Sequence, residues 1–252
     1  EMGDEGPPPA LPDVLDDLAM RFVVNCPQEE QESFERLLFQ VEQAFWFYQD
    51  QYSEIWPDSF PKHSLLTFSQ ALFHQCELLK PFAPRAEEIY KAFTLYKSTI
   101  PTCGAMLLNE DWTKVLLVKS YWKSGSSGAW GFPKGKIDQD EEKVDCAVRE
   151  VLEEVGYDCS ALIDANEYVE MQWKQQTMRL YVVPGVPEST SFVTRTKKEI
   201  GEISWHVVKD LPTSRDVEGK QKPFWMVGPF IGRLNTWIGK KKVARKKAKA
   251  KA

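Results

Sequence analysis

The sequence lacks several features that would place it in common classes of protein. Its five cysteines form no C-x-x-C pair, and only three histidines occur in 252 residues. A disulfide framework and a structural zinc site both depend on such residues, so the sequence argues against both and favours a reducing compartment. No apolar run approaches the ~18 residues that a membrane span requires, and the N-terminal residues do not resemble a signal peptide. We therefore expect an intracellular, cytoplasmic protein.

Acidic residues are absent after Glu218, although the chain as a whole has a net charge of −5. Eleven lysines and arginines follow that residue, and eight of them lie between Lys240 and Lys251. A basic end on an acidic body is typical of a protein that binds a polyanion. A solvated or disordered tail and a nuclear-import signal are alternative interpretations of residues 240–252, and both stay open at this point.

Hydrophobic periodicity divides the chain into a helical part and a mixed part. From residue 13 to residue 96 apolar side chains recur every three or four positions, which predicts an all-helical domain of four helices. Five short β-rich runs follow residue 101; a helical pattern at 141–154 interrupts them and another at 224–237 closes the region. The second part is therefore expected to be an α/β domain with a mixed sheet.

Changes in composition suggest the domain boundaries. Residues 1–12 are acidic and then proline-rich, which predicts a disordered leader. We expect an α+β multidomain fold with an all-helical domain at 13–96, a hinge linker at 97–100, an α/β domain with its closing helix at 101–239, and a basic tail at 240–252.

Glycines and charged residues form a dense pattern between positions 135 and 156. Its fixed elements are Gly135, Glu141, Arg149, Glu150, Glu153, Glu154 and Gly156. Helical residues three or four apart lie on the same side, so the last three glutamates converge and repel one another unless a divalent cation neutralises them. An all-oxygen set selects Mg²⁺ or Mn²⁺, whose open positions accept water and diphosphate oxygens. An ordinary solvated acidic face is the alternative, which the flanking glycines and Arg149 disfavour.

This segment resembles the Nudix box, G-x5-E-x7-R-E-U-x-E-E-x-G-U, in which U is apolar. Every fixed position matches between residues 135 and 157. The resemblance implies a Nudix α/β/α sandwich that hydrolyses phosphoanhydrides with a divalent metal. It also implies that Glu150 and Glu154 are the main metal ligands, with Glu153 beside them, and that Glu141 and Arg149 form a structural ion pair.

Four further segments resemble the catalytic subunits of mRNA-decapping complexes, a branch of the Nudix family. They are FWFYQD at 45–50, GFPKGK at 131–136, TKKEIGEISW at 196–205 and KPFWMVGPFIGRL at 222–234. The resemblance runs from about Leu11 to about Trp237. It implies hydrolysis of the 5′ cap of mRNA to 7-methyl-GDP and 5′-monophosphate RNA, in the cytoplasm and its mRNA-decay granules (P-bodies), with a nuclear pool left open.

The same resemblance implies roles for residues outside the box. Glu199 matches a metal ligand or the general base for the attacking water, and Glu153 is the other candidate base. Glu202 lies too close in sequence to Glu199 to be excluded from that role. RNA beyond the cap would follow basic residues before the box and in the closing helical segment, which are Lys134, Lys136, Lys220, Lys222 and Arg233.

Trp46 and Asp50 match the cap site of the same family. The two residues are four apart on a predicted helix and therefore face the same way. An indole face attracts the cationic 7-methylguanine base, and a carboxylate accepts from its N–H edge. A core tryptophan is the alternative. Because the two residues precede the linker and the glutamates follow it, cap hydrolysis would require the domains to close, which a small activator subunit on the helical domain would favour.

Two other functions stay open. The first is a Nudix hydrolase of free nucleotides, such as a dinucleoside polyphosphate or a nucleoside-diphosphate sugar. The second is a non-catalytic RNA-binding scaffold with a decayed box, although the intact glutamates argue against decay. No Walker A motif and no Ser/His/Asp set occurs in the sequence, which disfavours nucleoside-triphosphatase and serine-hydrolase chemistry.

Overall fold

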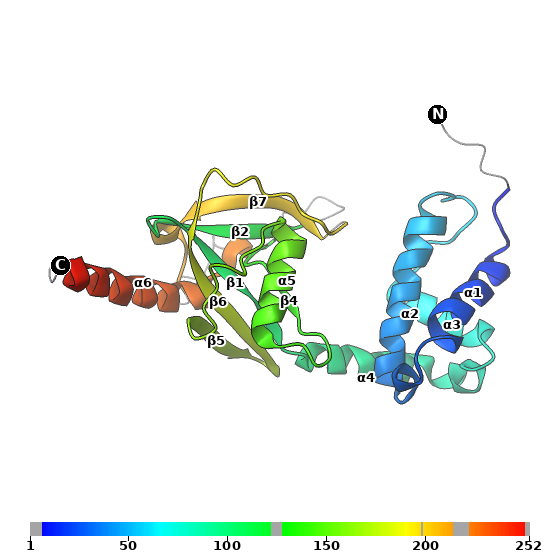
Figure 1. Ribbon diagram of the computed structural model, residues 1–252. Coiled ribbons are helices and arrows are strands. Elements are labelled where there is room, and N and C mark those ends of the chain that lie inside the picture. The colour runs from blue at the N-terminus through cyan, green and yellow to red at the C-terminus, as the bar shows by residue number, and fades with distance from the viewer. Residues whose placement is uncertain (1–6, 122–127, 198, 214–221, 250–252) are drawn as a thin grey trace. The chain divides into compact units, whose positions relative to one another are not determined.

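A computed structural model describes residues 7–121, 128–197, 199–213 and 222–249 of the chain. Contacts divide the chain into two compact units, with the boundary between Ser98 and Thr99. The first unit is drawn from blue to blue-green in Figure 1, and the second from green to red. No helix among the described residues is long and apolar enough to cross a membrane.

Helices build the whole first unit, as predicted. They are α1 (Leu11–Ala19), α2 (Phe34–Tyr48), α3 (Leu65–Gln75) and α4 (Ala86–Thr99). Two of them begin at serine caps: the Ser33 side chain accepts from the Arg36 backbone N–H, and Ser64 forms a capping box with Thr67. Short π-helical turns at Met20–Val24 and Gln49–Ser53 extend α1 and α2, and 3₁₀ turns lie at Gln28–Gln31 and Lys80–Arg85.

An aromatic core holds the four helices together. Leu18, Leu38 and Phe68 are fully buried at its centre. The ring of Tyr48 is fully buried too, and its hydroxyl donates to the Pro61 carbonyl at 2.8 Å, so its polar atom is satisfied. The apolar positions three and four apart that predicted the helices are therefore the positions that build the core.

A mixed sheet forms the centre of the second unit. Its strands are β1 (Thr102–Asn109), β2 (Lys114–Ser120), β3 (Trp130–Gly131), β4 (Lys134–Lys136), β5 (Tyr168–Trp173), β6 (Gln176–Val186) and β7 (Ile200–Val207). The main path is β3-β2-β1-β6-β5, with β4 paired to β1 and β7 to β2. Strands β1 and β6 run parallel, whereas the other pairs are antiparallel. The predicted mixed sheet is confirmed.

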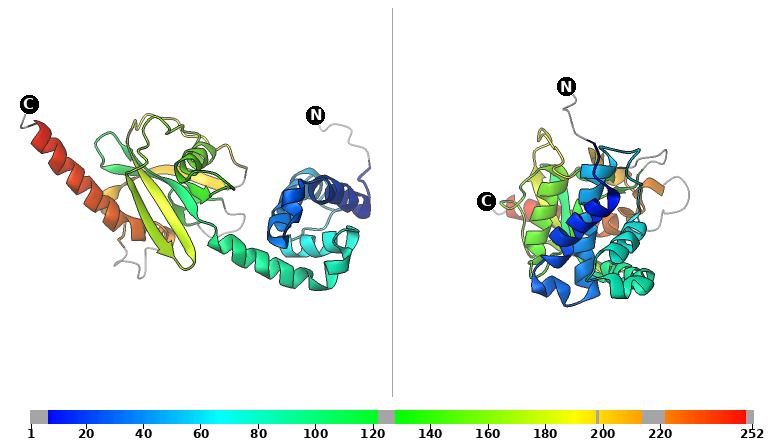
Figure 2. Two further views of the ribbon diagram at one scale, coloured as in Figure 1. Left: turned by 60° about the horizontal axis from the view of Figure 1, so that its bottom comes forward. Right: turned by 90° about the vertical axis from the view of Figure 1, so that its right-hand side faces the viewer.

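Helices cover both faces of this sheet. Ala105 and Leu107 of β1 pack on the side of α5 (Lys143–Val155), whereas Met106 and Leu108 pack on the side of α6 (Gly228–Lys249). Alternate strand residues point to opposite faces, which explains why β1 is buried along its whole length. Figure 2 shows the two helices from further directions. The predicted α/β/α sandwich is confirmed.

The structure differs from the sequence prediction at three boundaries. Helix α1 begins at Leu11, inside the predicted leader, and α4 continues through the predicted linker to Thr99. It ends there because Pro101 disfavours helical backbone at the residue before it. The predicted basic tail is helical as far as Lys249. Lysine, arginine and alanine are good helix formers, and the segment only has to prolong a helix that is already packed.

Candidate active site

Helix α5 carries the glutamates of the box, and glycine ends it. Gly156 has a φ of 71°, and its N–H donates to the Leu152 carbonyl at 3.0 Å. This left-handed conformation is strained for other residues, and a Cβ at this position would lie 2.3 Å from the Val193 carbonyl oxygen. The glycine therefore fixes where the helix stops and where the chain after it passes.

An ion pair ties the loop before α5 to the helix. The Nε and Nη2 of Arg149 lie 2.7 and 2.8 Å from the two carboxylate oxygens of Glu141, and Nη2 also donates to the Lys136 carbonyl at 3.0 Å. Hydrogen bonding to the guanidinium lowers the pKa of Glu141 to about 2. The predicted structural ion pair of Glu141 and Arg149 is confirmed.

Replacing Glu141 with glutamine should lower the free energy of unfolding by on the order of 2 kcal/mol at pH 7. The pKa of this carboxyl is depressed in the folded state, so its contribution is present above the ordinary value of about 4.5 and is lost as the pH falls toward about 2. Urea unfolding between pH 7 and pH 3 measures the difference. The exposed neighbour in Glu142→Gln is the matched control. An equal loss in both variants, or a difference that does not change with pH, contradicts the account.

Two of the predicted metal ligands are held in places unfavourable to charge. Burial raises the pKa of Glu154 to about 8, even though the Lys134 backbone N–H donates to its Oε2 at 3.1 Å. Burial also raises the pKa of Glu150, whose carboxylate lies against the Cα of Gly135. A Cβ at Gly135 would come within 2.1 Å of that carboxylate, so any other residue there would displace the Glu150 side chain. A nearby positive charge would stabilise the ionised form of both carboxyls.

The two candidate bases lie beside this pair but differ in their surroundings. The side chain of Glu153 is 44% exposed, and its Oε2 is 3.4 Å from Nη1 of Arg149. Glu199 lies on the loop before β7, where its carbonyl accepts from the Tyr121 N–H at 2.7 Å. The negative charge of Glu199 raises the pKa of both Glu150 and Glu154, so its carboxylate is close enough to act on them.

Glu202, the alternative to Glu199, has a different partner. It lies on β7 opposite Lys119 of β2, and the ammonium and carboxylate of these residues are 3.4 Å apart. Its charge affects His206 and is not among the causes of the raised pKa values of Glu150 and Glu154. Of the two glutamates, Glu199 is the one whose charge is among the main causes of the raised pKa values of Glu150 and Glu154.

The side chains around Gly135 offer oxygen donors of the kind that a divalent cation binds. Across the described residues, no three histidine, cysteine or acidic side chains converge tightly enough to form a complete metal site. Arg149 accounts for part of this, because its Nη1 holds the Glu150 Oε1 at 2.7 Å. The donors themselves fit: they are carboxylate oxygens with raised pKa values, grouped around a glycine, which a hard cation would bind.

The predicted cap-site residues belong to the first unit. Trp46 lies on α2 and is 53% exposed, whereas its neighbours Phe45 and Tyr48 are buried. The alternative of a core tryptophan is therefore wrong, and Phe45 and Tyr48 fill the core instead. Asp50 is half-buried in the π-helical turn Gln49–Ser53 that continues α2. The indole of Trp46 contacts the ring of Phe45, with centroids 5.3 Å apart, and about half of the residue is open to solvent.

The predicted RNA-binding residues are distributed over the second unit. Lys134 and Lys136 lie on β4, and the Lys134 backbone N–H donates to the carboxylate of Glu154. Arg233 is exposed on α6, where Nη1 donates to the Glu170 carbonyl. Lys220 lies outside the described residues, and Lys222 begins a 3₁₀ turn, Lys222–Phe224.

Sequence reasoning missed an exposed aromatic pair near these basic residues. Trp173 at the end of β5 and Trp225 before α6 are 40% and 43% exposed, and their ring centroids are 6.2 Å apart. Exposed indoles beside basic residues are suited to stacking single-stranded bases. The available signal was two tryptophans 52 positions apart, one of them in the aromatic segment 222–234, and this does not reveal that they are neighbours.

Comparison with known proteins agrees with this geometry. The Dcp2 box A domain matches residues 13–96, and the NUDIX domain matches residues 99–224. The chain belongs to the Nudix family. Its helical unit matches the Dcp2 box A domain, and relatives named as mRNA-decapping subunits match most of the chain, which confirms the resemblance found in the sequence.

Relatives match both units together. The chain is 47% identical over 244 residues to mRNA decapping complex subunit 2 of Schizosaccharomyces pombe, covering 94% of this chain and 32% of the relative. It is 46% identical over 232 residues to mRNA-decapping enzyme subunit 2 of Arabidopsis thaliana, covering 90% and 60%. The chain thus spans about a third to three fifths of the length of these relatives. A solved Ap4A hydrolase complex from C. elegans is 13% identical with a TM-score of 0.42, covering 55% of this chain and 98% of that one.

Proposed function

We propose that this chain hydrolyses the 5′ cap of mRNA, releasing 7-methyl-GDP and a 5′-monophosphate RNA. The observation that carries the proposal is the pair Glu150 and Glu154, two carboxyls with raised pKa values beside Gly135, in a chain whose other unit is a box A domain. The names of the relatives, which are decapping enzymes, support the same activity.

A divalent cation, Mg²⁺ or Mn²⁺, is part of the proposal. Glu150 and Glu154 would hold it, with Glu153 beside them. When bound, such a cation offsets the charge of the phosphate oxygens and of the leaving phosphate. The burial that raises the pKa of Glu154 leaves this carboxyl needing a positive partner, which is the reason to assign it as a ligand.

The remaining chemistry belongs to side chains of the second unit. Hydrolysis breaks the anhydride bond between the second and third phosphates, counted from 7-methylguanosine, and water supplies the oxygen. Glu199 or Glu153 would take the proton from that water, since both carboxylates lie at the rim of the buried pair. The ammonium groups of Lys134 and Lys136 would orient the phosphates.

Recognition of the cap base is assigned to Trp46 and Asp50. The exposed indole of Trp46 can stack on 7-methylguanine, whose positive charge adds cation–π attraction. Asp50 would accept hydrogen bonds from the base's N–H edge. One RNA molecule has to contact both units during the reaction. A small activator subunit that binds the helical unit would promote that state, and mRNA-decay granules are where we expect the complex.

The affinity for RNA beyond the cap should depend on salt concentration in a way that can be tested. Replacing Lys220, Lys222 and Arg233 with glutamine should weaken RNA affinity and flatten its dependence on salt, because fewer counterions are released. For single strands the slope should fall by about 0.7 per lost phosphate contact, or about 2 for three. Titrations of a labelled 30-nucleotide RNA at several salt concentrations measure both effects.

The control for this prediction is Lys209→Gln, which removes an exposed charge elsewhere on the same unit. Cleavage of very short capped RNA should suffer less than cleavage of long RNA in the triple variant. Equal losses on short and long RNA, with an unchanged salt slope, would instead assign these residues to folding of the closing helix.

A comparison of cleavage rates on four substrates tests the proposal against its alternatives. Capped RNA, the bare cap dinucleotide, a dinucleoside polyphosphate and a nucleoside-diphosphate sugar are offered separately with Mg²⁺ or Mn²⁺. We expect capped RNA to be cleaved far faster than the bare cap. Preferential cleavage of the free nucleotides identifies a nucleotide hydrolase, and RNA binding without any cleavage identifies a scaffold. Either result overturns the proposal.

A further inference from the structure

A groove of about 470 Å³ lies under the second half of α6, on the second unit. Val182 and Pro184 of β6 line its sheet side, and Leu162 closes it from the loop after α5. Ala244 and Ala248, one turn apart on α6, leave space beneath the helix because their side chains are short. Val182 packs on the face of the sheet opposite α5, so the groove is separate from the glutamate cluster.

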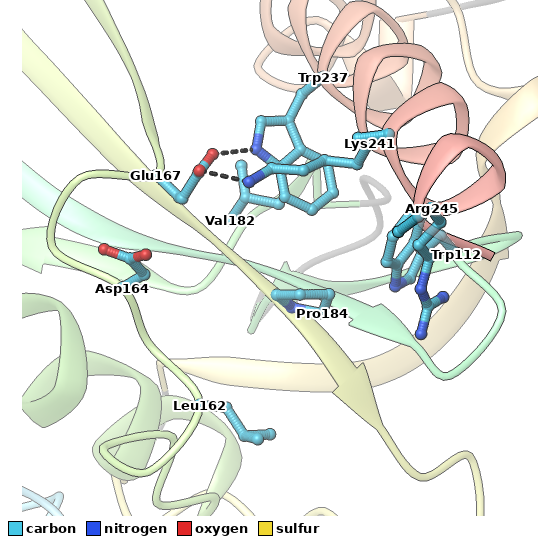
Figure 3. Close-up of a pocket in the computed structure, with 11 residues that line it drawn as sticks. Trp112, Leu162, Asp164, Glu167, Val182, Pro184, Trp237, Lys241 and Arg245 are labelled. Atoms are coloured by element: carbon cyan, nitrogen blue, oxygen red, sulfur yellow. Dashed lines mark hydrogen bonds and ion pairs between the residues drawn. The ribbon is translucent and has the colours of Figure 1, made fainter. Parts of the chain in front are cut away.

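The acidic groups of the groove already have partners. Glu167 accepts from the Trp237 indole N–H through one oxygen and from the Lys241 ammonium through the other, as the dashed lines in Figure 3 show. Asp164 accepts from the backbone N–H of Asn166 at 2.9 Å. Both oxygens of Glu167 are therefore engaged within the protein, and so is one oxygen of the exposed Asp164.

The aromatic faces are occupied as well. The Arg245 guanidinium lies over the ring of Trp112 at 4.5 Å, and the Lys241 ammonium lies over the ring of Trp237 at 5.5 Å. Trp112 is only 9% exposed, so its ring has no open face beyond the one under Arg245. A nucleotide base needs an open aromatic face for stacking. The groove is therefore poorly suited to a base, in contrast to the exposed Trp173 and Trp225.

The guanidinium of Arg245 is the charged group of the groove that can bind an acidic ligand. Within the described part of the chain its guanidinium contacts the Trp112 ring and forms no ion pair. Figure 3 shows it beside Trp112 at the edge of the groove. A guanidinium that stacks on an indole keeps its N–H donors in the plane of the group, where a carboxylate can accept two of them. Exposed lysines of the same helix add further positive charge, and the chain has no acidic residue after Glu218.

We propose that this groove binds a segment of a partner protein in which an aliphatic side chain is flanked by acidic residues. The aliphatic side chain would fill the space between Leu162, Val182 and Ala248, which are apolar. A neighbouring carboxylate would pair with Arg245. The volume is within the ~300–1,000 Å³ usual for binding sites of compact ligands, so one or two side chains fill it.

The probe for this proposal is a fluorescein-labelled peptide of twelve residues in which every third residue is leucine and the rest are aspartate. A second peptide with serine in place of leucine has the same charge without the apolar anchor. Fluorescence anisotropy at 150 mM salt measures both, on the whole chain. We expect the leucine peptide to bind at least ten-fold more tightly than the serine peptide.

Three variants separate the groove from general attraction between charges. Arg245→Glu removes the proposed carboxylate partner, and Ala248→Trp fills the apolar space without changing the charge. Lys246→Glu is the matched control, because it makes the same charge change on an exposed neighbour that does not line the groove. Circular dichroism verifies that each variant keeps its helix content.

Binding of the leucine peptide should fall at least ten-fold in Arg245→Glu and in Ala248→Trp, and less than three-fold in Lys246→Glu. An equal loss in Arg245→Glu and Lys246→Glu shows unspecific attraction and overturns the proposal. Unchanged binding in Ala248→Trp overturns it as well. A third result would also overturn the proposal: neither peptide binds, but a labelled oligouridine binds and loses its binding in Ala248→Trp. That result would assign the groove to RNA.

Discussion

Replacing Glu154 with glutamine should slow cap hydrolysis by roughly 1000-fold while leaving RNA affinity within about two-fold of the unmodified chain. The substitution keeps the shape of the side chain but removes a charge from the proposed cation site, and charge stabilisation by a cation is worth several kcal/mol, at ~1.4 kcal/mol per decade of rate. Glu150→Gln should behave the same way. Single-turnover cleavage of capped RNA measures the rate, and Asp145→Asn, an exposed change on the same helix, is the control.

The same variant should be more stable than the unmodified chain when no divalent cation is present. The pKa of Glu154 is raised in the folded state to about 8. A carboxyl with a raised pKa stabilises the folded state at pH values below its ordinary pKa of about 4.5. That stabilisation is lost as the pH rises through the folded-state pKa of about 8. At pH 8 the free energy of unfolding of the glutamine variant should exceed that of the unmodified chain by on the order of 3 kcal/mol, because glutamine has no charge to bury.

Melting curves with and without divalent cation complete this test. Mg²⁺ or Mn²⁺ should raise the melting temperature of the unmodified chain, because a ligand that binds only the folded state stabilises it. It should have little effect on Glu154→Gln. Near-normal cleavage by this variant, or an equal rise in melting temperature on adding the cation, would show that Glu154 does not hold the metal.

Trp46→Ala should slow hydrolysis of capped RNA by roughly 5- to 150-fold at saturating RNA. Stacking on an aromatic side chain is worth ~1–3 kcal/mol, and RNA affinity would come mostly from the basic surface of the second unit. The effect should therefore appear in the rate of the bound complex. Because Trp46 is 53% exposed, the melting temperature should change little. The defect should be larger on a methylated cap than on an unmethylated one, which lacks the positive charge.

Two variants calibrate this prediction. Trp46→Phe keeps an aromatic face and should recover most of the rate. Phe45→Ala removes a buried neighbour and should lower stability by ~3–5 kcal/mol, with no preference between methylated and unmethylated caps. If Trp46→Ala cleaves both caps at the unmodified rate, or loses stability as Phe45→Ala does, the tryptophan does not contact the cap.

The box was predictable from sequence because its chemistry is local. The spacing of Arg149, Glu150, Glu153 and Glu154 places them on one helix, and Glu141 lies within reach of that helix through a short loop. The central strands were predictable for a similar reason: β1 and β2 are short, nearly continuous apolar runs because both of their faces are buried. Spacing alone could not show that Glu154 is partly buried, because that depends on the backbone of Lys134, which lies on strand β4.

Contacts between distant segments could not be read from the chain. The pairing of Trp173 with Trp225 and the approach of Glu199 to the box depend on how the hairpin and the loop before β7 fold back. The helical conformation of the basic segment after Lys240 was not predicted, because its composition is compatible with both a disordered tail and a helix. The packed first half of α6 decides between them, and that packing is a tertiary property.

The products of cap cleavage test most directly the proposal that this chain cleaves the mRNA cap between its second and third phosphates. RNA carrying a radiolabelled 7-methylguanosine cap, incubated with the chain and Mg²⁺ or Mn²⁺, gives labelled products that chromatography separates. The account predicts labelled 7-methyl-GDP together with RNA ending in a 5′-monophosphate, and no product with Glu154→Gln. Labelled 7-methyl-GMP, or an intact cap under conditions in which free dinucleoside polyphosphates are hydrolysed, would contradict it.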